Sequence, residues 1–164
     1  MSRAAGNVLV LGIGNLLMRD DGVGVHVVQR LIDDQPRLPD DVRVVDGGTL
    51  GLDLLPLVDE ARALVVVDAV DLRARPGTVR ILRDAELNDT PGGHLSPHQV
   101  GLRDLLAVGR LTGRLPDRLA LVAVQPAAIE PGLDLTAACR AAVPRAVAAV
   151  RAEIDVVRAV AGAA

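Results

Sequence analysis

The chain has 164 residues, half of them apolar, a net charge of −3, and no Phe, Trp, Tyr or Lys. This length predicts a single domain over residues 1–164 with an aliphatic core. Without Lys there is no Walker-type phosphate loop and no Schiff base, and without aromatic side chains there is no platform for stacking bases. The acidic balance also argues against a nucleic-acid partner.

Cysteine content and the length of the apolar runs point to a compartment. Cys139 is the single cysteine, which excludes an internal disulfide and a cysteine-based zinc site. The longest apolar runs, such as Ala63–Val67 and Leu119–Val124, are far shorter than the roughly 20 residues of a membrane helix. We therefore expect a cytoplasmic protein that makes no membrane contact.

Hydrophobic periodicity and continuous β-branched runs predict strands and helices that alternate along the chain. In chain order they are a strand at Asn7–Gly12, a helix at Asp21–Asp34, a strand at Val42–Asp46, a helix at Leu50–Val58, strands at Leu64–Asp68 and Thr78–Arg83, a helix at Gln99–Thr112, a strand at Leu119–Val124 and a helix at Leu135–Ala161. The first helix carries an apolar stripe, formed by Val23, Val27, Val28, Leu31 and Ile32. The alternating Thr78–Arg83 is expected as an edge or antiparallel strand, and Pro144 is expected to kink or divide the last helix.

Strands that alternate with helices predict an α/β fold. We expect a three-layer sandwich with a mostly parallel, roughly five-stranded twisted sheet and helices on both faces. In such folds ligands bind outside the carboxyl ends of the strands. The residues that follow each strand are therefore the candidates for a functional site.

The glycine-bearing segment Gly12–Gly24 follows the first strand. A dinucleotide-binding loop would need a third glycine, where this chain has Leu17, and a helix that starts at once. Asp20 and Asp21 would also repel a bound pyrophosphate, although Asp46 ends the second strand as a ribose-binding acid would. A dinucleotide-binding module is therefore the weaker interpretation.

Acidic residues and glycines stand where predicted strands end. One of Asp20 and Asp21, most naturally Asp20, is expected to cap the following helix, which leaves Asp21 to face the cleft. Asp68 ends a buried strand, where a carboxylate is desolvated unless it is paired, and a turn-forming and a functional role are equally open for it. Gly47 and Gly48 either permit a close ligand or simply form a turn.

The segment Ser96–Gln99 has the signature of a helical capping box with proline at the first helical position. It places His98 in the first turn of a helix, where the helix dipole favours the neutral imidazole that a metal ligand requires. A solvated first-turn histidine is the simpler alternative. His94 lies in a Pro- and Gly-rich loop, and His26 is expected on the surface of the first helix.

Asp21, Asp68 and His98 all map to the carboxyl edge of the predicted sheet. Two carboxylates and one imidazole suit a divalent metal of the nickel, zinc or manganese type. A catalytic triad fits less well, because the chain has only two serines and Cys139 lies in an Ala-rich helix where packing is its expected role.

From about Asn7 to the last helix, the chain resembles the nickel–iron hydrogenase maturation endopeptidases. Four segments in this order carry the resemblance: Gly12–Gly22, Asp46–Thr49, Val67–Ala69 and Ser96–Gln99. The resemblance implies a cytoplasmic protease that removes the C-terminal extension of a hydrogenase large-subunit precursor after nickel has been inserted. It implies that the substrate protein carries the nickel, although other divalent metals can occupy such a site. The simplest expectation is a monomeric free enzyme and a transient one-to-one complex.

The resemblance places the metal contacts of the family at Asp21, Asp68 and His98, the residues that the strand ends also select. The family often has Glu at the first position, and Asp21 is one methylene shorter. Asp46 is a fourth candidate, for substrate contact or acid–base catalysis. Either the metal polarises a water or the scissile carbonyl, or a carboxylate acts as general base while the metal serves recognition.

Two other functions stay open at this stage. A non-catalytic, nickel-dependent maturation chaperone would bind the large subunit but leave its C-terminus intact. A dinucleotide-binding α/β module would be stabilised against heat by dinucleotides, whereas the protease would not.

Overall fold

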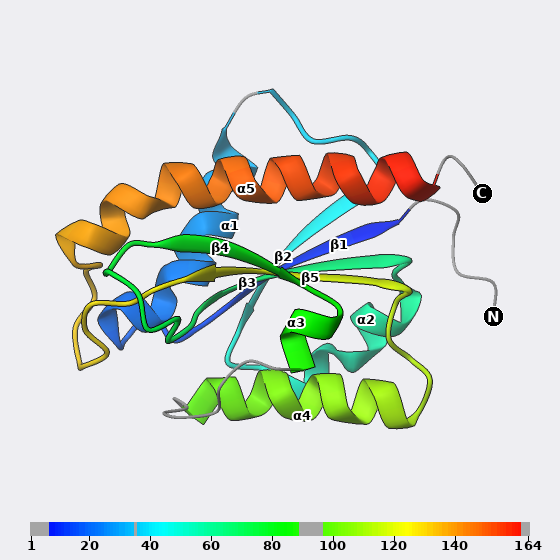
Figure 1. The fold of residues 1–164 in the computed structure, drawn as a ribbon, viewed down its shortest axis with the longest axis horizontal. Helices are drawn as coiled ribbons and strands as arrows, with labels where there is room; N and C mark the ends of the chain where they lie inside the picture. Colours follow the sequence, from blue (N-terminus) through cyan, green and yellow to red (C-terminus); the bar gives the residue numbers. More distant parts are fainter. Residues whose placement is uncertain (1–6, 35, 89–96, 162–164) are drawn as a thin grey trace.

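A five-stranded sheet forms the centre of the molecule in the computed structural model, which describes residues 7–34, 36–88 and 97–161 (Figure 1). In chain order the elements are β1 (Val8–Ile13), the 3-10 helix η1 (Arg19–Gly22), α1 (Val23–Asp33), β2 (Val42–Gly48), the 3-10 helix η2 (Gly51–Leu54), α2 (Leu55–Glu60), β3 (Ala63–Ala69), β4 (Val79–Arg83), α3 (Ala85–Asn88), α4 (Pro97–Leu111), β5 (Arg118–Val124) and α5 (Ala137–Ala161).

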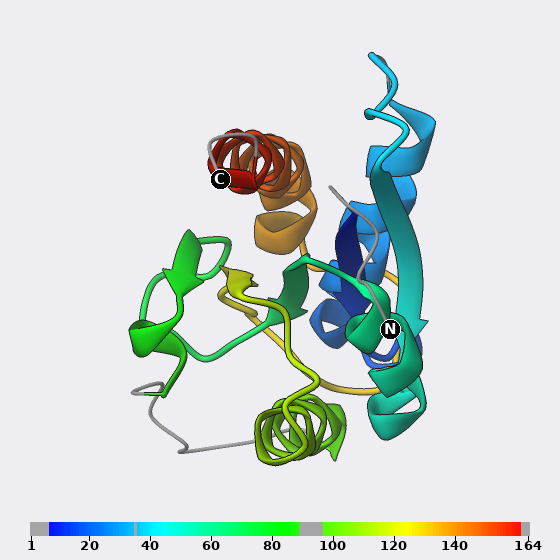
Figure 2. The same ribbon diagram turned by 90° about the vertical axis from the view of Figure 1, so that its right-hand side faces the viewer.

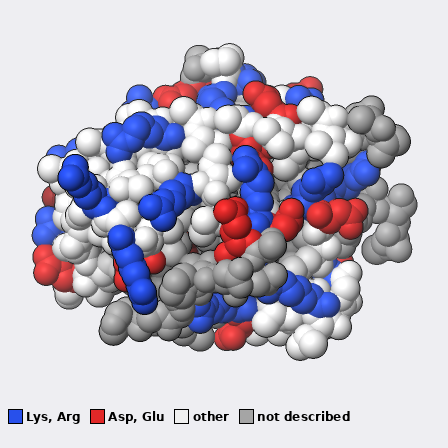
Figure 3. Space-filling model, in the orientation of Figure 1, with Lys and Arg blue, Asp and Glu red and all other residues white. Residues whose placement is uncertain are grey.

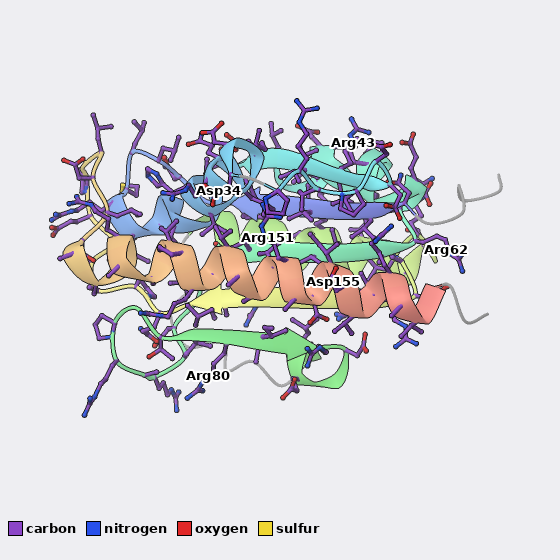
Figure 4. The ribbon with its side chains drawn as sticks, turned by 90° about the horizontal axis from the view of Figure 1, so that it is seen from above. Asp34, Arg43, Arg62, Arg80, Arg151 and Asp155 are labelled. Carbon is purple, nitrogen blue, oxygen red and sulfur yellow. The ribbon has the colours of Figure 1, made fainter. Side chains whose placement is uncertain are left out.

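The sheet has the strand order β2-β1-β3-β5-β4. All neighbouring pairs are parallel except β4 with β5, which is antiparallel, so the expected edge strand is confirmed. The two edge strands carry exposed arginines, Arg43 on β2 and Arg80 on β4, at opposite sides of the molecule (Figure 4). Charged side chains on an edge strand discourage pairing with a second chain.

Helices cover both faces of the sheet, as the three-layer prediction requires. Helices α1 and α5 lie on one face, and α2 and α4 lie on the other (Figures 1 and 2). Alternate strand residues serve the two faces: Val65 of β3 packs under α1 and α5, whereas Leu64 packs toward α2 and α4. Because β3 lies in the middle of the sheet, all seven of its residues are buried.

Three local predictions are wrong or incomplete. Ile32 is 58% exposed and does not belong to the buried stripe of α1, although Val28, one turn earlier on the same side, is fully buried; Ile32 is the last residue but one of the helix. The single helix expected over Leu50–Val58 is instead η2 followed by α2, and Pro56 lies in the first turn of α2, where a missing N–H is tolerated. The short helix α3 was not anticipated.

Pro144 does not divide the last helix. Helix α5 runs from Ala137 to Ala161, and its axis bends in the part nearest its start (Figure 1). Buried residues on both sides of the proline, such as Val143 and Ala146, hold the two parts against the sheet. Tertiary packing therefore outweighs the lost backbone hydrogen bond, leaving a bend rather than a break.

Charges are unevenly spread on the face shown in Figure 3. Basic side chains are concentrated on the left of the view, where β4 and α5 begin. Exposed arginines of these segments are Arg73, Arg75, Arg80, Arg140 and Arg145. Within the described residues, none of the helices is long and apolar enough to cross a membrane.

Candidate functional site

The first turn of α1 packs directly against the carboxyl ends of β1 and β3. A Cβ atom at Gly24 would lie 2.2 Å from the carbonyl oxygen of Val67 and 2.4 Å from that of Ile13. Only a glycine leaves room for the helix to approach this closely. The contact holds η1, which immediately precedes α1, against the end of β3.

Asp21 and Asp68 are both buried at this edge of the sheet, 2% and 0% exposed. Asp21 belongs to η1, and its Oδ2 accepts a hydrogen bond from the backbone N–H of Asn15 at 3.2 Å. Asp68 is the last residue but one of β3 and stands opposite Ala123 of β5. The strand ends thus place two buried carboxylates on neighbouring elements, as the sequence predicted.

Asp20 is an anchor between distant loops, so its expected role as a helix cap is wrong. Its Oδ2 accepts hydrogen bonds from the N–H groups of Ala127 (2.9 Å) and Ala128 (3.1 Å), and Thr136 donates from its N–H to Oδ1 and from its hydroxyl to Oδ2, both at 2.8 Å. Burial alone would raise the pKa of Asp20. The hydrogen bonds from Thr136, Ala128 and Ala127 outweigh burial, so the pKa of Asp20 is lowered.

The loop after β1 is joined to the loop after β5. Met18 and Gly132 form an isolated parallel bridge, in which the Gly132 N–H donates to the Leu17 carbonyl at 2.9 Å and the Arg19 N–H donates to the Gly132 carbonyl at 2.9 Å. The Arg19 side chain also forms an ion pair with Glu130 at 2.9 Å. These contacts close the region around η1 on the side of α5.

Asp46 lies at the end of β2 and is exposed. The register between β1 and β2 shifts here, so that Gly47 is an extra residue in β2. Asp46 Oδ1 accepts a hydrogen bond from the Gly48 N–H at 3.0 Å, and the Gly48 carbonyl accepts one from Gly14 at 2.9 Å. Gly48 has φ +45°, a conformation that favours glycine and fits a turn, and the approach of a ligand to the two glycines stays a prediction.

His98 is the second residue of α4, so its predicted place in a first helical turn is confirmed. Its side chain lies outside the described part of the structure, as do Ser96, the expected cap, and His94. The helix is located by a close contact one turn further on, because a Cβ atom at Gly51 would lie 3.5 Å from the Cα of Gly101. The first half of α4 therefore lies against η2, the 3-10 helix that follows β2.

A three-residue metal site stays a prediction. Among the described side chains, no group of three or more His, Cys, Asp or Glu residues could hold a metal ion, and the imidazole of His98 is not among them. The described part of the expected constellation consists of Asp21 and Asp68, whose oxygen donors suit a divalent cation.

Two further residues, His26 and Cys139, were expected from the sequence to lie outside the functional site. His26, expected on the surface, is half-buried, and burial lowers its pKa while Asp134 acts in the opposite direction. Cys139 is fully buried and donates to the Gln125 carbonyl, so its expected packing role is confirmed. Burial, followed by the negative charge of Asp20, raises the pKa of the Cys139 thiol to about 11.

Comparison with known proteins identifies the family of this chain. Residues 25–153 match the family model described as hydrogenase maturation protease. The chain belongs to this family. It is 46% identical over 131 residues to the hydrogenase expression/formation protein HupM of Azotobacter chroococcum mcd 1, a match that spans 79% of this chain and 62% of HupM. The hydrogenase 2 maturation protease of Escherichia coli (strain K12) is 43% identical over 130 residues, 79% of each chain.

Solved structures of the family have the same fold. The hydrogenase maturating endopeptidase HybD from E. coli superimposes with a TM-score of 0.83 at 39% identity, over 91% of this chain and 92% of HybD. The [NiFe] hydrogenase maturation protease HybD from Thermococcus kodakarensis, at 24% identity, shares the fold with a TM-score of 0.72 over 90% and 99% of the two chains. Against the first three curated relatives, HupM, HoxM and HupD, the match spans only 62%, 61% and 59% of their length.

Proposed function

We propose that this chain is an endopeptidase that removes the C-terminal extension of a nickel–iron hydrogenase large-subunit precursor after nickel insertion. One observation carries the proposal: within a fold of the hydrogenase maturation protease family, the buried carboxylates of Asp21 and Asp68 stand at the edge where ligands of α/β sheets bind. Acidic side chains that are buried at a ligand-binding edge are candidates for a catalytic or metal-binding role.

In the proposed complex, Asp21, Asp68 and His98 contact the nickel that the precursor carries. This contact lets the enzyme act only on a loaded precursor and positions the scissile peptide beside the carboxylates. Asp46 is exposed, and one of its oxygens accepts the Gly48 N–H, which leaves the other for a substrate group or a water. We therefore assign Asp46 to substrate contact or to proton transfer.

The structure disfavours the dinucleotide alternative. The 3-10 helix η1 packs tightly against the turn after β1. A Cβ atom at Gly14 would lie only 2.0 Å from the carbonyl oxygen of Asp21, so no space for a phosphate remains between them. The buried acids Asp20 and Asp21 occupy the position at which a pyrophosphate would need backbone N–H donors.

The test uses purified nickel-loaded precursor, with the mass of the large subunit as the readout. We expect the wild-type chain to shorten the precursor, and we expect Asp68→Asn and His98→Ala to abolish shortening. Asp71→Asn is the matched control, because Asp71 is exposed in the loop after β3 and should process normally. Full processing by His98→Ala would remove His98 from the mechanism.

Two further measurements sharpen the assignment. Because the family often has Glu at the position of Asp21, we expect Asp21→Glu to retain cleavage, whereas Asp21→Asn loses it. If Asp46→Asn abolishes cleavage while the nickel-dependent complex still forms, Asp46 acts in the chemical step. A wild-type chain that binds the loaded precursor but leaves its mass unchanged would establish the chaperone alternative instead.

A further inference from the structure

Exposed large apolar side chains are concentrated at the edge of the sheet that holds the buried carboxylates. Five of them, in the described residues, follow the carboxyl ends of β1, β2 and β5; these five, here called the apolar rim, are Leu17, Leu50, Leu52, Ile129 and Leu133. The most exposed are Leu17 at 64% and Leu133 at 71%. The other large exposed apolar side chains lie toward the C-terminal ends of α1, α4 and α5, namely Ile32, Leu111, Val156 and Val160.

Backbone hydrogen bonds join the segments that carry the apolar rim. The last residue of β2, two positions before Leu50, meets the loop after β1 through the bond from Gly14 N–H to the Gly48 carbonyl, 2.9 Å. The loop after β1 meets the loop after β5 through the bond from Gly132 N–H to the Leu17 carbonyl, 2.9 Å. Strands β1 and β5 flank β3, whose end bears Asp68, so the rim borders the position of the buried carboxylates.

The part of the rim nearest Asp21 is held rigidly in place. Asp20, the residue before Asp21, accepts two hydrogen bonds from Thr136 and one each from Ala127 and Ala128. The Arg19–Glu130 ion pair adds a second connection between the same loops. A surface that is ordered before binding loses little conformational entropy when a partner docks.

We propose that the apolar rim is the docking surface for the large-subunit precursor, and that it receives aliphatic segments of the precursor on both sides of the bond to be cut. This inference rests on the proposed function. Because β1 and β5 flank β3 in the sheet, a chain bound at the end of β3 would lie between the loops that carry Leu17 on one side and Ile129 and Leu133 on the other. The protein has no aromatic side chain, so among the described residues the large exposed apolar side chains available for anchoring at this edge are these leucines and Ile129.

The test replaces Leu17 and Leu133 together by Asn, a neutral residue that adds no charge beside the acids. The matched control is Leu111→Asn, at a position 88% exposed near the end of α4. We expect the rim variant to raise KM for nickel-loaded precursor by about tenfold or more, with kcat at saturating precursor little changed. The control should keep both constants, and thermal unfolding of all three proteins should coincide.

Three results would overturn the proposal: a KM within twofold of wild type for the rim variant, an equal rise in the control, or a loss of kcat with KM unchanged. Sedimentation of the free protein tests the rival occupant, because a wild-type dimer that the rim substitutions dissociate would assign the rim to a second copy of the chain. If wild type binds precursor without shortening it, the proposed function fails, but comparing the Kd of wild type and rim variant for the same precursor still decides the role of the rim.

Discussion

The carboxylate of Asp20 accepts two hydrogen bonds of 2.8 Å from Thr136, a residue 116 positions further along the chain. One comes from the N–H and one from the hydroxyl, and each reaches a different carboxylate oxygen. This pair ties the segment before α1 to the loop before α5. Because Asp20 precedes Asp21, the contact fixes the backbone of the candidate site. The residues around Asp20 in the sequence do not indicate that its partner lies in this distant loop.

Asp20→Asn is expected to destabilise the protein by about 2–4 kcal/mol. Asparagine keeps one acceptor oxygen but turns an NH₂ group toward N–H donors, which leaves buried donors of Ala127, Ala128 or Thr136 unsatisfied. Urea unfolding at pH 7 measures the change. Asp33→Asn, at an exposed position in α1, is the control and should stay within about 0.5 kcal/mol of wild type.

The contribution of Asp20 should disappear in acid. Its pKa is lowered in the folded protein, so the unfolded chain binds the proton more readily in the interval between the folded and unfolded values. The stabilisation is therefore complete above the unfolded pKa, near 4, and is lost as pH falls through the folded pKa. Unfolding free energies of wild type and Asp20→Asn should converge below pH 4, and a constant gap down to pH 2 would contradict this assignment.

Most of the fold was predictable because its signals are local. The run Leu64–Val67 marks a central strand by composition alone, and the alternation in Thr78–Arg83 identified the antiparallel edge. The proline that begins α4 likewise located His98 in a first helical turn. In each case the deciding residues are neighbours in the chain, so the pattern and the structure agree.

What the sequence did not reveal depends on partners far apart in the chain. Asp20 resembles a helix cap by position, but its partners lie 107 to 116 residues away. Whether Pro144 would kink or divide the last helix was open from the sequence, and packing against the sheet keeps α5 continuous with a bend (Figure 1). Whether Asp21, Asp68 and His98 converge on one ion depends on side-chain placement, which periodicity does not determine, and that constellation remains a prediction.

The ion pair between Arg83 and Glu153 should show strong coupling. Arg83 donates to both carboxylate oxygens, with an Nη2–Oε2 distance of 2.7 Å, and joins the edge strand β4 to α5. Glu153 is 2% exposed, whereas the Arg83 side chain is 49% exposed. Because Glu153 is buried, removing its cation should lower the free energy of unfolding. Water around the exposed Arg83 side chain screens the ion pair and makes this loss smaller.

We expect Arg83→Leu to destabilise by about 2 kcal/mol, because it leaves the buried carboxylate of Glu153 without its cation. Adding Glu153→Leu to that variant should restore most of the loss, since two apolar side chains replace the pair. A double-mutant cycle in urea measures the coupling. Losses that simply add in the double variant would show that the ion pair does not hold β4 to α5.

Cys139 should be chemically inert in the native protein. Its thiol is buried beside Asp20, and its pKa is raised to about 11, so almost no thiolate exists at pH 8. Labelling with a thiol-specific reagent at pH 8 should be slow in buffer. It should be fast in about 6 M guanidinium chloride, which unfolds the protein and exposes the thiol. The Asp20→Asn variant should label faster than wild type in buffer, because it weakens the hold on Thr136, whose hydroxyl accepts the Cys139 N–H.

Gly24→Ala separates helix propensity from packing at the site. Alanine is favoured over glycine inside a helix by about 1 kcal/mol, so propensity alone predicts a more stable protein. The added Cβ would instead lie 2.2 Å from the Val67 carbonyl oxygen and 2.4 Å from that of Ile13, which are backbone atoms that cannot rotate away. We expect a net destabilisation of about 2 kcal/mol or more.

The same substitution should harm processing beyond its effect on stability. The clash moves the start of α1, and with it Asp21, away from the end of β3 that bears Asp68. Cleavage of the loaded precursor, measured at a temperature where the variant is fully folded, should fall at least tenfold, as displacement of about 1 Å does in other sites. Gln29→Ala, at an exposed position of the same helix, should slightly stabilise the protein and leave cleavage unchanged. A folded Gly24→Ala variant with wild-type cleavage would show that the close approach of α1 to β3 does not set the geometry of the two acids.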